Sequence, residues 1–131
     1  MGYLLRPVLD GPRPTKDFQD WPAWRALVVT YLTELHKELG GTLIVPQSVY
    51  VEKYWAEIRE GLAGIDMRAV TLEVDRAELE RRIKDDALEA GSVAWRLERI
   101  ADYVNALPWL RRETEMIDAS GSPAELATLL S

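Results

Sequence analysis

This sequence of 131 residues contains no cysteine and a single histidine, His36. Without cysteine the chain has no disulfide, no thiolate metal site and no cysteine nucleophile. One histidine also excludes a metal centre built from several imidazoles. No signal-peptide-like apolar region opens the sequence, so these absences together predict a reduced, cytoplasmic setting.

Glycine-rich phosphate-binding loops are absent as well. The glycines occur singly, except for the Gly40–Gly41 pair, and neither G-x-x-x-x-G-K-[ST] nor G-x-G-x-x-G is found. Such loops hold nucleotide phosphates with closely spaced backbone N–H groups and, in the first motif, with a lysine. The direct sequence signature of a phosphate-binding site is therefore missing.

The sequence also lacks a positive charge excess and a long apolar run. Its net charge is −6, whereas a general nucleic-acid binder needs a basic surface to neutralise phosphates. No apolar run approaches the roughly 20 residues of a membrane-spanning helix. We therefore expect neither nucleic acid nor a membrane as a partner.

What the sequence does contain is typical of a globular α/β domain. Apolar spacing and helix-start signals predict helices, and short apolar runs predict strands. Because strands alternate with helices, we expect a parallel sheet with helices on both faces. The expected helices span residues 20–39, 51–62 and 92–107, with two more beginning at 75 and 122, and the expected strands span 42–45, 69–74 and 115–118.

Three stretches of the sequence carry a resemblance to a known family. They are Asp17-Phe18-Gln19-Asp20-Trp21-Pro22-Ala23-Trp24-Arg25, then Gly41-Thr42-Leu43-Ile44-Val45-Pro46-Gln47-Ser48-Val49, then Ala94-Trp95-Arg96-Leu97 with Tyr103, residues 117–120 and residues 122–125. In order and spacing the chain resembles the tunicamycin-resistance protein family of bacterial ATP-binding proteins. That family belongs to the P-loop kinases of small molecules, and the resemblance extends from Gly2 to Leu130.

The resemblance implies a three-layer α/β sandwich with a parallel sheet, lacking its first strand, P-loop and second strand. It implies one partial domain over residues 1–131, with a substrate region at about 1–50, a lid at about 81–99 and a C-terminal strand and helix at 114–131. The intact family domain is an ATP- and Mg²⁺-dependent phosphotransferase or antibiotic-resistance protein. Without the loop we expect this chain to be inactive alone. The alternative is a non-catalytic, truncated interaction module that self-associates through open sheet edges.

The resemblance assigns the acceptor substrate to the N-terminal region. Phe18 and Trp21 offer flat apolar surface to a ring-bearing substrate, while Arg25 pairs with an anion. The alternative places Trp21 at the start of its helix as a packing residue, and we expect Trp24 to be core. Arg6 either holds the acceptor or is a solvated helix-end arginine. Pro46 and Gln47 follow a predicted strand, where open α/β sheets bind ligands.

By the same resemblance, Arg82 and Arg96 are the catalytic arginines of a lid that closes over ATP. Such arginines stabilise charge on a transferring phosphate. The competing account is an ordinary salt-bridged helix surface, since Arg81 and Asp85, and likewise Arg96 and Ile100, are spaced for one helix face. Ser120, Gly121 and Ser122 follow the last strand and correspond to the loop that contacts adenine, although they also make a normal strand-to-helix turn. No metal ligand is assigned.

Overall fold

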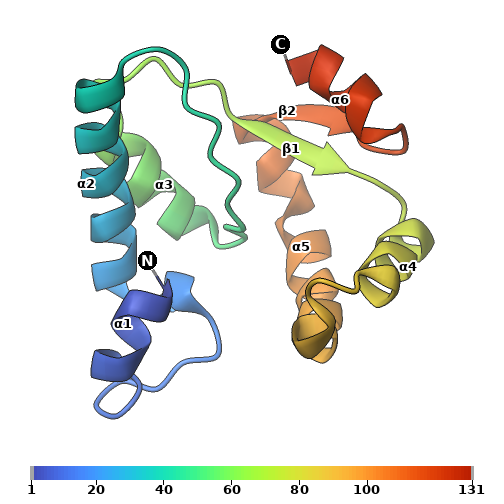
Figure 1. The fold of residues 1–131 in the computed structure, drawn as a ribbon, viewed down its shortest axis with the longest axis horizontal. Coiled ribbons are helices and arrows are strands. Elements are labelled where there is room, and N and C mark those ends of the chain that lie inside the picture. Colours follow the sequence, from blue (N-terminus) through green and yellow to red (C-terminus); the bar gives the residue numbers. More distant parts are fainter. Residues whose placement is uncertain (1, 131) are drawn as a thin grey trace. The chain divides into compact units, whose positions relative to one another are not determined.

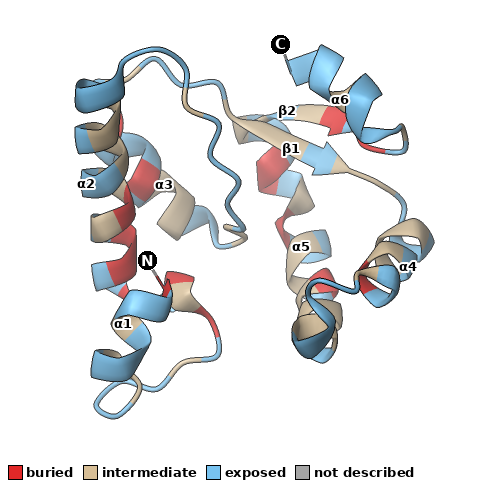
Figure 2. Ribbon diagram, in the orientation of Figure 1, coloured by how far each residue is buried: buried red, intermediate tan, exposed pale blue. Residues whose placement is uncertain are grey.

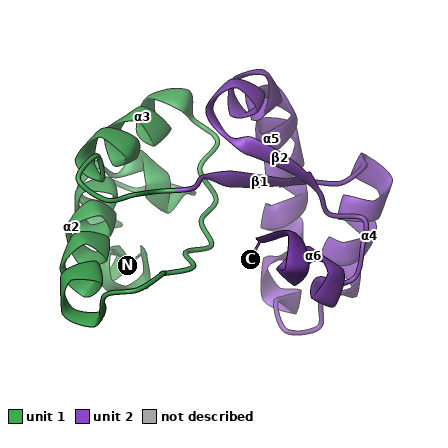
Figure 3. Ribbon diagram, turned by 90° about the horizontal axis from the view of Figure 1, so that it is seen from above, with its two compact units in different colours: residues 1–67 green, residues 68–131 purple. Residues whose placement is uncertain are grey.

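The computed structural model describes residues 2–130. The chain divides into two compact units, residues 1–67 and residues 68–131 (Figure 3). The expectation of a single partial domain over 1–131 stays a prediction.

The first unit is helical. It contains α1 (Gly2–Leu9), the short 3-10 helix η1 (Phe18–Asp20), α2 (Pro22–Leu39) and α3 (Glu52–Gly61) (Figure 1). Proline suits the first position of α2, because the N–H that it lacks has no partner within the helix there. The helix ends at Leu39 and is followed by Gly40, whose φ of 62° lies in the region that favours glycine.

The core of this unit lies between α2 and α3. Trp21, Trp24 and Val28 from the start of α2 pack against Ile58 and Leu62 (Figure 2). Their spacing places them on one helical face. The two helices approach closely, since a Cβ on Gly61 would lie 2.7 Å from a methyl carbon of Val29. The expected core role of Trp24 is confirmed, with 7% of the residue exposed.

The second unit holds a two-stranded parallel sheet. Strands β1 (Val70–Glu73) and β2 (Glu115–Asp118) pair in register, with Val70 opposite Glu115 and Glu73 opposite Asp118. The connection contains α4 (Arg76–Asp85), η2 (Ala90–Ser92) and α5 (Val93–Glu113), and α6 (Pro123–Leu130) follows β2. A helical crossover of this kind is what parallel strands require.

Local signals fix the boundaries of the second unit's helices. The Asp75 side chain accepts a hydrogen bond from the Glu78 N–H and caps α4. Glu125 accepts from both the N–H and the hydroxyl of Ser122 at the start of α6, as in a capping box. Arg68 forms two hydrogen bonds with the Glu115 carboxylate and donates to the carbonyls of Leu129 and Leu130.

The buried side chains of the second unit come from its two longer helices, from β2 and from the residue after it. They are Ile83, Ile100, Ala106, Trp109, Leu110, Ile117 and Ala119.

The predicted fold class is wrong. Residues 2–130 are mostly helical and contain only the two strands β1 and β2, so no three-layer parallel-sheet sandwich is formed. The expected strand at 42–45 lies in a segment without regular structure, and Ile44 is 88% exposed. Four β-prone residues form a strand only when a neighbouring strand supplies hydrogen bonds, and 42–45 has no such neighbour among the described residues.

The other expected elements are present, β2 with its expected bounds and several of the rest with shifted ends. Helix α5 continues to Glu113, six residues beyond the expected end, and passes through Pro108. Residues Gly2–Leu9 form a helix that includes Pro7. None of the helices within residues 2–130 is long and apolar enough to cross a membrane.

Candidate functional site around η1

Three of the predicted substrate residues come together around η1. The guanidinium carbon of Arg6 lies 4.7 Å from the centre of the Phe18 ring. Phe18 stacks on Trp21, with ring centres 5.8 Å apart, and the edge of Tyr3 meets Phe18 at 5.6 Å. The result is an aromatic surface with a cation above it, which we call the η1 cluster (Tyr3, Arg6, Phe18 and Trp21).

The members of the η1 cluster differ in accessibility. Trp21 is only 3% exposed, and its indole N–H donates to the Arg13 carbonyl at 2.7 Å, so it supports the cluster from beneath. Tyr3 is 83% exposed, and Phe18 is half-buried. The Arg6 side chain is half-exposed and lies 3.7 Å from Asp10, within a weak surface ion pair. Arg6 and Tyr3 can therefore meet a ligand.

Arg25, the fourth predicted residue, is built into the interior. Its Nε donates to Glu57 at 2.5 Å, and its Nη1 donates to the backbone carbonyl of Gln19 at 2.6 Å. The guanidinium also lies 4.0 Å from the centre of the Tyr54 ring. Because only 6% of Arg25 is exposed, these contacts give it a structural role that joins η1, α2 and α3.

Pro46 and Gln47 are exposed, and the chain just after them is fixed to η1. The Gln19 side chain accepts from the Tyr50 N–H at 3.2 Å and donates to the Ser48 carbonyl at 3.5 Å. The Tyr50 hydroxyl donates to the Asp17 carboxylate, which also accepts from the Gln19 N–H. The two segments that were predicted to form the substrate region are therefore joined, although by residues that the prediction did not select.

The predicted catalytic arginines, Arg82 and Arg96, lie in α4 and α5 of the second unit and are both held by carboxylates. Arg82 Nε donates to Glu78 at 2.6 Å, and Arg96 Nη1 donates to Asp86 at 2.8 Å. Hydrogen bonds from Arg81 and then Arg82 lower the pKa of Glu78 to about 2. The hydrogen bond from Arg96 lowers the pKa of Asp86. This pattern is that of an ion-paired surface.

In the loop expected to contact adenine, backbone N–H groups are already hydrogen-bonded to nearby carboxylates. Ser120 and Gly121 precede α6, and the Ser120 N–H donates to Asp118 at 2.8 Å. The Ser122 N–H donates to Glu125 at 2.7 Å. The side chain and then the N–H of Ser120 lower the pKa of Asp118, and the N–H and then the hydroxyl of Ser122 lower that of Glu125. The N–H groups at this helix start therefore already bind negative charge at neutral pH.

The described residues therefore do not fit the phosphates of ATP. Binding them would require displacement of carboxylates from both predicted lid arginines and from the loop before α6. No cluster of three or more acidic or histidine side chains within residues 2–130 could hold Mg²⁺. No catalytic step through ATP or Mg²⁺ can be derived from these side chains.

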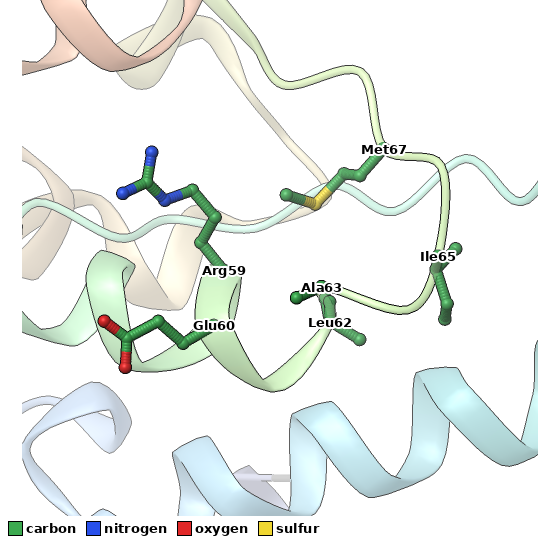
Figure 4. Close-up of a pocket in the computed structure, with 6 residues that line it drawn as sticks. All are labelled: Arg59, Glu60, Leu62, Ala63, Ile65 and Met67. Carbon is green, nitrogen blue, oxygen red and sulfur yellow. The ribbon is translucent and has the colours of Figure 1, made fainter.

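Two shallow hollows lie in the first unit. One, of about 330 Å³, is formed by the end of α3 and the segment after it, with Leu62, Ile65 and Met67 beside Arg59 and Glu60 (Figure 4). The other, of about 560 Å³, lies between α1 and α2 and is lined by Leu4, Leu27, Thr30 and Tyr31. Both are mainly apolar and offer few groups for specific recognition.

Sequence reasoning did not select Gln19, Asp17 or Tyr50. The only signal was the presence of two polar side chains beside Phe18 in a segment otherwise rich in aromatic residues. Comparisons with protein-family models, with curated proteins and with solved structures found no match to this chain.

Proposed function

We propose that this chain is the acceptor-binding part of an ATP-dependent phosphotransferase for small molecules, of the antibiotic-resistance type inferred from its sequence. The observation that carries the proposal is the η1 cluster. Arg6, Phe18 and Trp21, which the resemblance assigns to the substrate, lie in consecutive contact rather than scattered through the unit.

The chemistry of the cluster indicates the class of acceptor. An exposed aromatic ring binds planar or ring-bearing molecules through its face, and an arginine beside it attracts a negatively charged group. Arg25 does not take this role, because its donors are already committed to Glu57 and to the Gln19 carbonyl. We therefore assign the anion contact to Arg6.

The phosphates of ATP and Mg²⁺ belong, in this proposal, to a part of the enzyme outside the described residues. The chain alone then binds the acceptor without transferring phosphate. Arg82 and Arg96 are paired with Glu78 and Asp86, so the proposal assigns them no contact with the nucleotide. A cytoplasmic location remains part of the proposal, as expected for a chain without cysteine.

A titration with two probes tests the acceptor site. Uridine monophosphate and uridine share their rings and differ in the negatively charged phosphate. We expect the monophosphate to shift the NMR signals of the Trp21 indole N–H and of Arg6, with uridine binding more weakly. Arg6→Met should reduce the difference between the probes, whereas Arg59→Met, the same change on α3, should not. If neither probe shifts the signals of the η1 cluster, the proposed acceptor class is wrong.

A second candidate function is strand pairing with another copy of the chain. The carbonyls of Ala69 and Glu73 accept from β2, so the alternating backbone groups of Val70 and Leu72 face away from it. Among the described residues the Leu72 carbonyl meets only the Tyr103 hydroxyl, at 3.5 Å. Such an edge is a template for another strand.

Analytical ultracentrifugation over a hundredfold concentration range tests this second candidate. Pairing predicts a dimer at high concentration that is lost in Val70→Pro, because proline removes the outward N–H without touching the pairing with β2. A monomer at every concentration contradicts it.

A further inference from the structure

The side chain of Gln19 makes an unusual set of contacts for a glutamine. It is 1% exposed, and it is the most completely buried large side chain among the described residues. A buried primary amide must satisfy both its oxygen and its nitrogen to avoid a large desolvation cost. Here the amide meets this need with the backbone of one loop, at the Ser48 carbonyl and the Tyr50 N–H.

For residues 48–50, these two hydrogen bonds take the place of those that a neighbouring β-strand would form. The segment has no regular structure, and a loop without backbone partners samples many conformations. Gln19 supplies one acceptor and one donor to alternate backbone groups, as an adjacent strand does. The packing of Val49 against the buried core of the unit adds an apolar contact at the same point.

The hydrogen bonds of the Gln19 side chain with Ser48 and Tyr50, which we call the clamp, are supported from both sides. Arg25 donates to the Gln19 carbonyl at 2.6 Å and is fixed by Glu57 on α3. The Asp17 carboxylate accepts from the Gln19 N–H and from the Tyr50 hydroxyl. Residue 19 is thus fixed at its N–H, its carbonyl and its side chain.

We infer that Gln19 is a positioning residue that holds the loop carrying Pro46 and Gln47 in a preformed arrangement for acceptor binding. The inference rests on the proposed function. A binding loop that is already ordered does not lose conformational entropy when the ligand arrives, and this increases affinity. Gln19 precedes α2 by only a few residues and directly follows Phe18 of the η1 cluster, so the same turn orients the aromatic surface and the loop.

Hydrogen exchange of the unmodified protein tests the clamp without any ligand. The Tyr50 amide lies outside regular secondary structure, so its protection depends on the Gln19 side chain. We expect clear protection at this amide and at least an approximately tenfold loss of it in Gln19→Met, which keeps the length and removes both hydrogen bonds. Gln47→Met makes the same change at an exposed position of the loop and should leave the protection of the Tyr50 amide unchanged. An unprotected Tyr50 amide in the unmodified protein overturns the inference, whether or not the variant folds.

Ligand affinity separates positioning from a purely structural role. With uridine monophosphate as the probe, we expect Gln19→Met to weaken binding about tenfold. Ile58→Val, a core change that lowers stability without touching the clamp, should bind the probe like the unmodified protein. If both variants lose affinity in proportion to their loss of stability, Gln19 is only structural and the inference is wrong. If the probe fails to bind the unmodified protein while the Tyr50 amide is protected, the proposed function fails and the clamp itself stands.

Discussion

The substitutions Arg25→Met and Arg6→Met should distinguish an arginine with a structural role from one that binds a ligand. In Arg25→Met the Gln19 carbonyl, which belongs to a residue only 1% exposed, loses its charged donor, at a cost of about 1–3 kcal/mol. Loss of the contact with the Tyr54 ring costs about 0.5–1 kcal/mol more. The 40% exposed Glu57 side chain regains water, so its ion pair adds only about 0–1 kcal/mol. We expect a loss of about 2–4 kcal/mol in the free energy of unfolding of the first unit.

Arg6→Met should have the opposite profile. The Arg6–Asp10 pair is half-exposed and long, at 3.7 Å, so removing it changes stability by less than about 1 kcal/mol. Loss of the contact with the Phe18 ring adds about 0.5–1 kcal/mol, so the total stays below the loss expected for Arg25→Met. The affinity for uridine monophosphate should fall instead. The same substitution at two positions thus costs stability at one and binding at the other.

A urea titration followed by two-dimensional NMR provides the assay. The indole N–H signals of Trp21 and Trp24 report on the first unit, and that of Trp109 reports on the second. Arg25→Met should lower the midpoint for Trp21 and Trp24 and leave that for Trp109 unchanged. Equal midpoints in the variant and the unmodified protein, or a larger loss in Arg6→Met, would refute the assignment of Arg25 as structural.

Three further changes have defined outcomes. Gly61→Ala should destabilise the first unit by about 1–3 kcal/mol in urea unfolding, because the new Cβ clashes with Val29. Adding Val29→Ala should recover part of this loss, and the absence of any recovery would exclude the clash as its cause. The pKa of Glu78 is lowered to about 2, so its ionised carboxylate stabilises the fold at neutral pH. That contribution is lost as the pH falls from about 4.3 toward 2. An NMR titration of the Glu78 carboxyl with its midpoint near 4.3 would contradict this. Asp75→Ala should cost about 1 kcal/mol in thermal or urea unfolding by removing the α4 cap, and an unchanged midpoint would show that the cap contributes little.

Local signals were sufficient to place most elements of the fold. Strand β2 was predicted with its observed bounds, and the cap at Asp75 and the capping box at Ser122 located two helix starts. Such signals act over a few residues and need no knowledge of the remaining chain. Tertiary context decided the rest. Residues 42–45 have the composition of a buried strand, but the described chain supplies no neighbouring strand with which they could pair. Without this strand, the sheet of the predicted sandwich does not form.

The candidate site was predicted in part. Arg6, Phe18 and Trp21 were selected by resemblance and do lie together. Arg25 was selected as an anion ligand and is engaged internally instead. The only sequence signal for Gln19 was its polar side chain beside Phe18, because its importance comes from hydrogen bonds to Ser48 and Tyr50, about thirty residues away. No local pattern reports such a distant pairing.

The contacts of Arg68 have a consequence for the connectivity of the second unit. This residue begins the unit, and its guanidinium reaches the carbonyls at the other end, 3.3 Å away at Leu130 and 3.4 Å away at Leu129. The beginning and the end of the unit therefore lie close together and are linked by the side chain of Arg68. A segment with adjacent ends can be inserted into a surface loop of another protein without changes to its interior. Its ends can equally be joined by a short linker, and new ends opened at the exposed turn around Leu88.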